Sequence, residues 1–136
     1  MRIISCILLM AFVFSEQNFN ERRIILIRAD TEHEGEMEQQ VEKLLQEKHE
    51  LKDRKIAIFT FYDNKLNSIF NTNSDSVEFI KHQLSEQNSE RENFSIQLFG
   101  LDGSEKSKFN KVTKPEVFFN KIDQMPMRRA ELGRQD

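Results

Sequence analysis

Two short apolar runs separated by a helical pattern constrain the fold of this chain more than any other feature. The first run is Ile24 to Ile27, and the second is Ile56 to Tyr62. A continuous apolar run of this length is typical of a strand that is buried on both faces of a sheet. Between the runs, residues 37–51 repeat Met, Val and Leu at helical spacing, with Glu and Lys on the opposite side. This order predicts a right-handed parallel crossover.

Three pairs of capping residues mark where helices are expected to begin. Each pair places a side chain that can bind free backbone N–H groups three residues before a glutamate. The pairs are Thr31 with Glu34, Asp75 with Glu78, and Thr113 with Glu116. Pro115 lies in the first turn of the third helix, where its missing N–H costs least, and Pro126 is expected to end that helix.

A hairpin is predicted between the second and third helices. Residues 94–98 alternate apolar and polar side chains, and Asp102-Gly103 provides a tight reversal into residues 105–109. The asparagine-rich residues 63–73 are interpreted as a turn region. The resulting order, β-α-β-α-β-β-α, predicts an α/β domain with one mixed sheet and helices on both faces.

Charge and length restrict the class of protein. The chain has 136 residues, which is enough for one domain, and a formal net charge of −3. A negative surface disfavours nucleic acid and anionic membranes, so neither is expected as a partner. Four lysines lie close together near the predicted hairpin, between two glutamates, and we interpret them as protection of an edge strand. They are Lys106, Lys108, Lys111 and Lys114.

The N-terminus has the pattern of an export signal. Arg2 precedes the apolar residues 3–14, and Val13 and Ser15 are small enough to precede a cleavage site. About twelve apolar residues are too few to span a bilayer. We therefore predict that residues 1–15 are a signal peptide that is removed, and that the protein is periplasmic or extracellular and not attached to the membrane. Because Cys6 is the only cysteine, the mature chain would contain no thiol.

Two segments in the second half of the chain carry a specific resemblance. They are Leu98-Phe99-Gly100-Leu101-Asp102-Gly103, followed by Lys106, and Ile122-Asp123-Gln124-Met125-Pro126-Met127-Arg128-Arg129-Ala130-Glu131. On these residues, the chain resembles domain-of-unknown-function family 4174 from about residue 21 to residue 131. That family looks like a set of short secreted bacterial proteins, and its domain also occurs in animal extracellular proteins with sushi repeats and in an extracellular-matrix coiled-coil protein. The resemblance implies a thioredoxin-like or peroxiredoxin-like fold and an exported location.

The residues of a redox site are missing from this sequence. In thioredoxin-like enzymes the nucleophilic thiol lies where the first strand passes into the first helix, which corresponds here to Arg28 to Glu32. These residues include no cysteine, and no proline precedes Phe94 where redox members keep a cis-proline. We therefore predict no catalytic residue and no cofactor.

Acidic residues and a histidine gather at the start of the first helix. A carboxylate and imidazole cluster can hold a divalent metal, but acidic residues are also favourable at the positive end of a helix. No second ligand pair with metal-type spacing occurs elsewhere, so no metal site is predicted. The residues are Asp30, Glu32, His33, Glu34 and Glu36.

The C-terminal arginines have two interpretations. Arg128 and Arg129 could clamp a carboxylate or phosphate of a ligand. Alternatively, they stabilise a helix end, and one of them pairs with Asp123 or Asp102 to hold the C-terminal segment on the sheet. Our candidate binding residues are those of this segment and of the hairpin turn: Asp102, Gly103, Asp123, Arg128, Arg129 and Glu131.

These observations predict a non-catalytic binding or adaptor module whose partner is an envelope or extracellular protein. The alternative is an antioxidant, peroxiredoxin-like oxidoreductase, which would require a metal or a thiol supplied by a partner. The sequence does not indicate an oligomeric state.

Overall fold

A computed structural model describes residues 20–86 and 92–134, and the predicted signal peptide lies outside these residues. Five strands form one sheet in the order β3-β2-β1-β4-β5. The strands are β1 (Arg23–Ala29), β2 (Ile56–Tyr62), β3 (Lys65–Phe70), β4 (Phe94–Phe99) and β5 (Glu105–Phe109). β1 and β2 are parallel, and the other neighbouring pairs are antiparallel. The predicted parallel crossover and the predicted hairpin are therefore confirmed.

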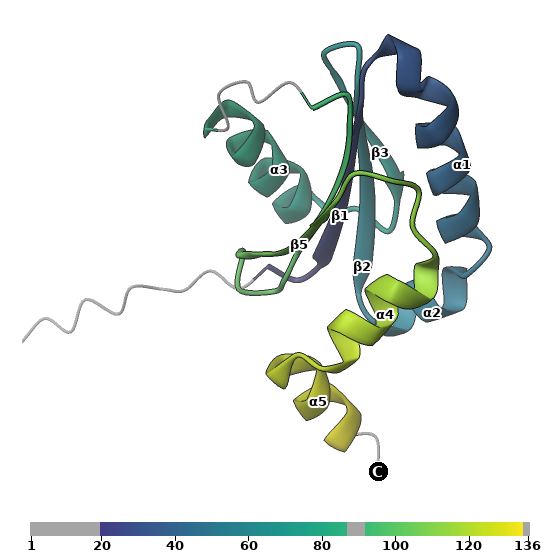
Figure 1. Ribbon diagram of the computed structural model, residues 1–136. Helices are drawn as coiled ribbons and strands as arrows, with labels where there is room; N and C mark the ends of the chain where they lie inside the picture. Colours follow the sequence, from purple (N-terminus) through teal and green to yellow (C-terminus); the bar gives the residue numbers. More distant parts are fainter. Residues whose placement is uncertain (1–19, 87–91, 135–136) are drawn as a thin grey trace, which may run out of the picture.

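Helices cover both faces of this sheet, as predicted. The helical elements are the 3-10 turn η1 (Thr31–His33), α1 (Glu34–Leu45), α2 (Lys48–Asp53), α3 (Ser74–Glu86), α4 (Pro115–Asp123) and α5 (Pro126–Gly133). α3 lies on one face, and α1, α2 and α4 lie on the other (Figure 1). The architecture is α/β and thioredoxin-like, with β3 and α5 added to the predicted order of elements. No helix among the described residues is long and apolar enough to cross a membrane.

The central strands supply both halves of the core. On β1, Ile25 and Ile27 pack with α1, α2 and α4, whereas Ile24 and Leu26 pack with α3. All four side chains have no exposed surface, because successive residues of a strand point to opposite faces and both faces are covered. Double coverage explains why the sequence shows a continuous apolar run here.

The interpretation of residues 63–73 as a turn region is wrong for most of that segment. Asp63 and Asn64 form a turn with φ angles of 51° and 57°, and residues 71–73 also lie outside a helix or strand. A two-residue loop with positive φ at both positions matches the right-handed twist of a hairpin. β3 then runs antiparallel to β2 as the edge strand, and its exposed Asn67 and Ser68 hide the apolar pattern of a strand.

The predicted capping pairs are also wrong, because neighbouring residues take that role in two cases and the third helix has no side-chain cap. Asp30, and not Thr31, accepts hydrogen bonds from the backbone N–H groups of Glu32 and His33. Asn73 and Ser76 exchange the capping hydrogen bonds of α3. The third predicted pair fails as well, because the N-cap residue of α4 is Lys114 and makes no side-chain cap.

The predicted boundaries of two helices also change. The first helix is interrupted after Leu45 and resumes at Lys48. Pro115 begins α4 as predicted, and α4 ends at Asp123. Pro126 lies beyond the end of that helix and also occupies the first position of α5. A missing N–H is harmless at this position, so proline ends one helix and starts the next.

Candidate functional site

The junction between β1 and α1, where thioredoxin-like enzymes hold their thiol, contains a carboxylate and an imidazole. Oδ1 of Asp30 lies 2.6 Å from Nδ1 of His33. This side-chain hydrogen bond raises the pKa of His33 and lowers the pKa of Asp30. The same Asp30 oxygen caps the 3-10 turn, so its hydrogen-bonding capacity is used within the fold. The pair therefore orients His33 at the entrance of α1.

His33 lines a polar cavity of about 610 Å³ beside this junction. Residues from three separate segments form its wall: His33 and Glu36, then Glu92, Asn93 and Phe94, and finally Asn110, Lys111 and Val112. The backbone N–H of Asp30 donates to the carbonyl of Asn93, which fixes the junction against the start of β4. The cavity thus lies between the β1–α1 junction, the start of β4 and the segment that follows β5.

The two carboxylate oxygens of Glu92, in the wall of the cavity, have different surroundings. One carboxylate oxygen, Oε1, lies 2.7 Å from Nζ of Lys108 on β5. The other oxygen, Oε2, is buried and accepts no hydrogen bond from the part of the chain that the structure describes. A buried acceptor without a donor is costly, so a bound group that donates a hydrogen bond would relieve this cost.

The sequence did not indicate Glu92, Asn110 or Lys111 as site residues. They meet His33 only because β4 pairs with β1 on one side and with β5 on the other. The acidic cluster at the start of the first helix was the one local signal of this site. Within residues 20–86 and 92–134, no group of three His, Cys, Asp or Glu side chains is arranged to hold a metal ion.

Three of the predicted C-terminal site residues, Asp123, Arg128 and Glu131, belong to a second polar centre at the end of the sheet where β1 begins. Arg128 has only 2% of its surface exposed. Its Nη2 lies 2.5 Å from Oδ2 of Asp53 on α2, and its Nε lies 3.3 Å from Oδ1 of Asp123 on α4. Its Nη1 donates to Glu131 on α5 at 3.3 Å. Arg128 therefore ties three helices together.

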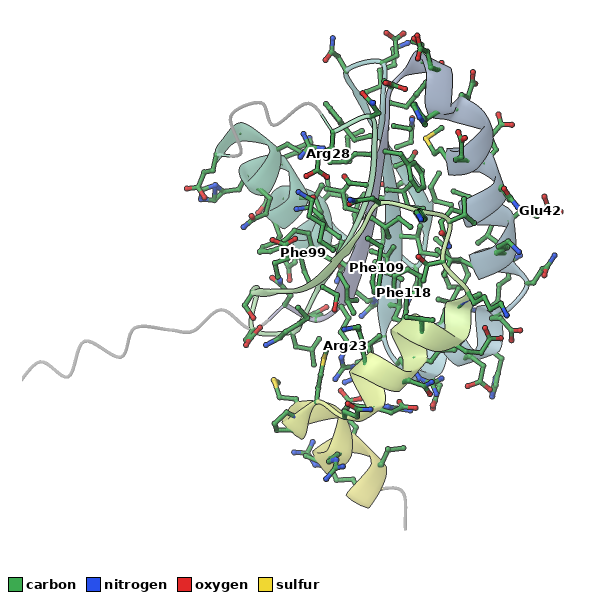
Figure 2. The ribbon with its side chains drawn as sticks, viewed as in Figure 1. Arg23, Arg28, Glu42, Phe99, Phe109 and Phe118 are labelled. Atoms are coloured by element: carbon green, nitrogen blue, oxygen red, sulfur yellow. The ribbon has the colours of Figure 1, made fainter. Side chains whose placement is uncertain are left out.

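Two further arginines complete this ion-pair network. Arg54 holds both oxygens of Asp123 at 3.0 and 2.9 Å and lies over the ring of Phe119. Burial alone would raise the pKa of Asp123, but the hydrogen bonds from Arg54 and Arg128 lower it below its usual value. Arg23, at the start of β1, donates to Glu131 and to the carbonyl of Arg54, and it lies where the sheet meets α4 and α5 (Figure 2). The network joins the sheet to the C-terminal helices.

Comparison with known proteins shows the family to which the sequence belongs. A family model described as a domain of unknown function, DUF4174, matches residues 14–131. The chain belongs to the DUF4174 family. No curated protein matches it, and no solved structure does.

The segment at residues 122–131, which carries the resemblance to the DUF4174 family, contributes several side chains to the ion-pair network. Asp123 and Glu131 both accept hydrogen bonds from Arg128, as the structural interpretation of the arginines requires. Arg129 is exposed, and its side chain has no partner among the residues that the structure describes. Binding of a ligand by these residues remains a prediction.

The hairpin turn with Asp102 and Gly103, which also carries the resemblance to the DUF4174 family, lies apart from the ion-pair network. Asp102 accepts hydrogen bonds from the backbone and hydroxyl of Ser104 and from Lys106, and these bonds lower its pKa to about 2 despite partial burial. Gly103 has a φ angle of +78°, and a Cβ there would lie 3.3 Å from the ring of Phe79 on α3. Glycine is favoured at this position because L side chains rarely adopt this backbone angle and because the Phe79 ring would have to shift to accommodate a Cβ. The contacts of Asp102 and Gly103 are with the hairpin and α3, and those of Arg128 are with α2, α4 and α5.

Proposed function

We propose that this DUF4174 protein is an exported, non-catalytic binding module that contacts an envelope or extracellular protein. Its contact site is the polar cavity at the β1–α1 junction. The observation that carries the proposal is the cavity itself, which holds Glu92 with a free buried oxygen and His33 oriented by Asp30. The earlier candidate surface, centred on Arg128, is less suited to a partner because that guanidinium is buried and engaged.

The residues at the junction support a non-catalytic role. Thiol chemistry in this fold needs a thiolate at the entrance of the first helix. Asp30 occupies this entrance and serves as a helix cap, and Cys6 is the only cysteine of the sequence. A scaffold that keeps the cavity without the nucleophile is suited to holding a group of a partner.

The chemistry of the cavity indicates the kind of group it would hold. Glu36 and Glu92 supply carboxylates, and His33 and Lys111 supply donors on the same wall. The free oxygen of Glu92 needs a donor, such as an amide, hydroxyl or ammonium group. A polar loop of a protein offers all of these.

A comparison of two variants tests the proposal. Glu36 and Lys111 are exposed residues of the cavity, so E36A/K111A should preserve the fold while removing one acceptor and one donor. Tagged wild-type and variant chains would be expressed in the native cell and recovered from the exported fraction, and copurifying proteins would be quantified by mass spectrometry. We expect a stoichiometric partner that E36A/K111A loses and that R129A, a control on α5, retains. Equal recovery by both variants would contradict the cavity as the contact site.

The absence of catalysis has its own test. The alternative function, an antioxidant of the peroxiredoxin class, requires turnover of peroxide. With a thiol reductant, the purified mature chain is expected to consume no hydrogen peroxide, whether a chelator or an added divalent metal is present. Sustained consumption above a buffer control would replace the binding module by an enzyme.

A further inference from the structure

An apolar groove runs between α1 and the β3 edge of the sheet, away from the cavity at the junction. Its cavity volume is about 630 Å³. One wall consists of Met37, Val41 and Leu45 on α1, and Thr60, Asn67 and Ile69 of β2 and β3 also line it. Among the described residues, β3 is the outermost strand on this side, so α1 leaves part of this face of the sheet uncovered.

The α1 wall has the spacing of a helix-packing surface. Met37, Val41 and Leu45 recur every four residues, so they form one stripe along the helix. Each is half-buried and packs against the core on its inner side, and each also lines the groove. The side of this stripe that faces the groove is an apolar surface on which a second helix could pack alongside α1.

Carboxylates accompany this stripe, and none of the described residues that line the groove is basic. Glu38 and Glu42 are exposed, lie one turn apart, and take part in no ion pair among the residues that the structure describes. Figure 2 shows Glu42 projecting from α1 into solvent. Two unpaired like charges beside an apolar surface favour a partner with positive charge next to apolar side chains.

We propose that this groove binds a cationic amphipathic helix of a partner protein. Its apolar side chains would pack on Met37, Val41 and Leu45, and its Lys or Arg side chains would pair with Glu38 and Glu42. The twelve residues of α1 extend over about 18 Å, which accommodates about three turns of a partner helix. Such a helix would cover β3 as α1 covers the neighbouring strands. The groove shares no residue with the cavity at the β1–α1 junction, so the two sites are tested separately.

A synthetic peptide of about fourteen residues, with Leu at helical spacing and Lys at the other positions, is the probe. It would be titrated into the isotopically labelled full-length chain, with NMR of the protein amides and circular dichroism of the peptide. We expect saturable shifts centred on Met37, Val41 and Ile69, together with a gain of peptide helicity.

Two double variants with the same change in net charge decide whether the groove is responsible. E38K/E42K should weaken binding about tenfold or more, because it replaces attraction by repulsion. E78K/E116K, which changes exposed glutamates on α3 and α4, should leave affinity within about twofold. The milder variant E38Q/E42Q provides a third affinity, expected to lie between those of wild type and E38K/E42K.

Three outcomes would overturn the proposal. Equal weakening by both charge reversals would show attraction to net charge alone. Binding of the peptide as an extended strand, with shifts confined to β3, would assign the edge to strand addition. A dimer in sedimentation that occupies the groove, and that E38K/E42K alters, would assign it to a second copy of the chain.

Discussion

Asp30 and His33 show how two residues shape the β1–α1 junction. Asp30 caps the 3-10 turn and pairs with His33, and the hydrogen bond between the two side chains raises the pKa of His33. The acidic cluster was visible in the sequence, but Asp30 was not predicted as the cap. Thr31 is also a good N-cap type, so residue preference alone did not decide between the two neighbours.

The Asp30–His33 pair predicts a pH dependence of stability. The pKa of His33 is raised above 6.5 in the folded chain, so its contribution is complete below pH 6.5 and is lost as pH rises through the folded pKa. Asp30 contributes above pH 3.8 and loses this contribution as pH falls through its lowered pKa. We therefore expect the difference in unfolding free energy between wild type and H33Q to be larger at pH 5.5 than at pH 8.5.

Chemical denaturation at the two pH values measures this difference. H49Q is the control, because His49 is exposed on α2 and has no ion pair among the described residues. A difference for H33Q that stays constant, or that grows as pH rises, would contradict the assigned pair.

At the scale of elements, α5 is held by electrostatics more than by apolar packing. Arg128 is its one buried residue, while Met127 and Leu132 are exposed. The three buried or nearly buried arginines of the network face the carboxylates of Glu50, Asp53, Asp123 and Glu131. Removing one member would leave its partners desolvated without compensation.

Arg128 and Arg129 provide a matched pair of substitutions. R128A should lower the unfolding free energy by about 2–3 kcal/mol, because several carboxylates lose a buried partner, although they are themselves partly exposed. R129A should change it by less than about 0.5 kcal/mol, because that side chain is exposed. Urea denaturation of both variants at pH 7 measures the effects, and equal values would contradict a structural role specific to Arg128.

At the scale of the whole molecule, the two sheet edges differ. β5 carries the exposed Lys106 and Lys108, which is typical of an edge protected from pairing. β3 begins with Lys65 and adjoins the groove on its α1 side. The lysine cluster is thus explained by its position on and near β5, in agreement with its interpretation from the sequence.

The predicted signal peptide determines where the whole protein is located. The protein recovered from the exported fraction of its native cell should begin at about Glu16, because cleavage is expected after Ser15. Intact-mass spectrometry reads this N-terminus directly. L8K should keep the precursor inside the cell by interrupting the apolar run, whereas Q17K, outside that run, should not. Recovery of a chain that retains Met1 from the cell interior would contradict the signal.

The sequence by itself determined the α/β class, the crossover, the hairpin and the order of most elements. These features follow from hydrophobic period and turn residues, which act over a few positions along the chain. β3 was not predicted, because an edge strand with exposed polar residues lacks the regular spacing of apolar residues that marks a strand.

Only the tertiary structure decided the cavity, the groove and the ion pairs that join the C-terminal segment to α2 and β1. Arg54 and Asp123 are 69 positions apart, and His33 meets Glu92 only through the pairing of β1 with β4. No local pattern records such distances, because the pairing of strands and the packing of helices bring these side chains together.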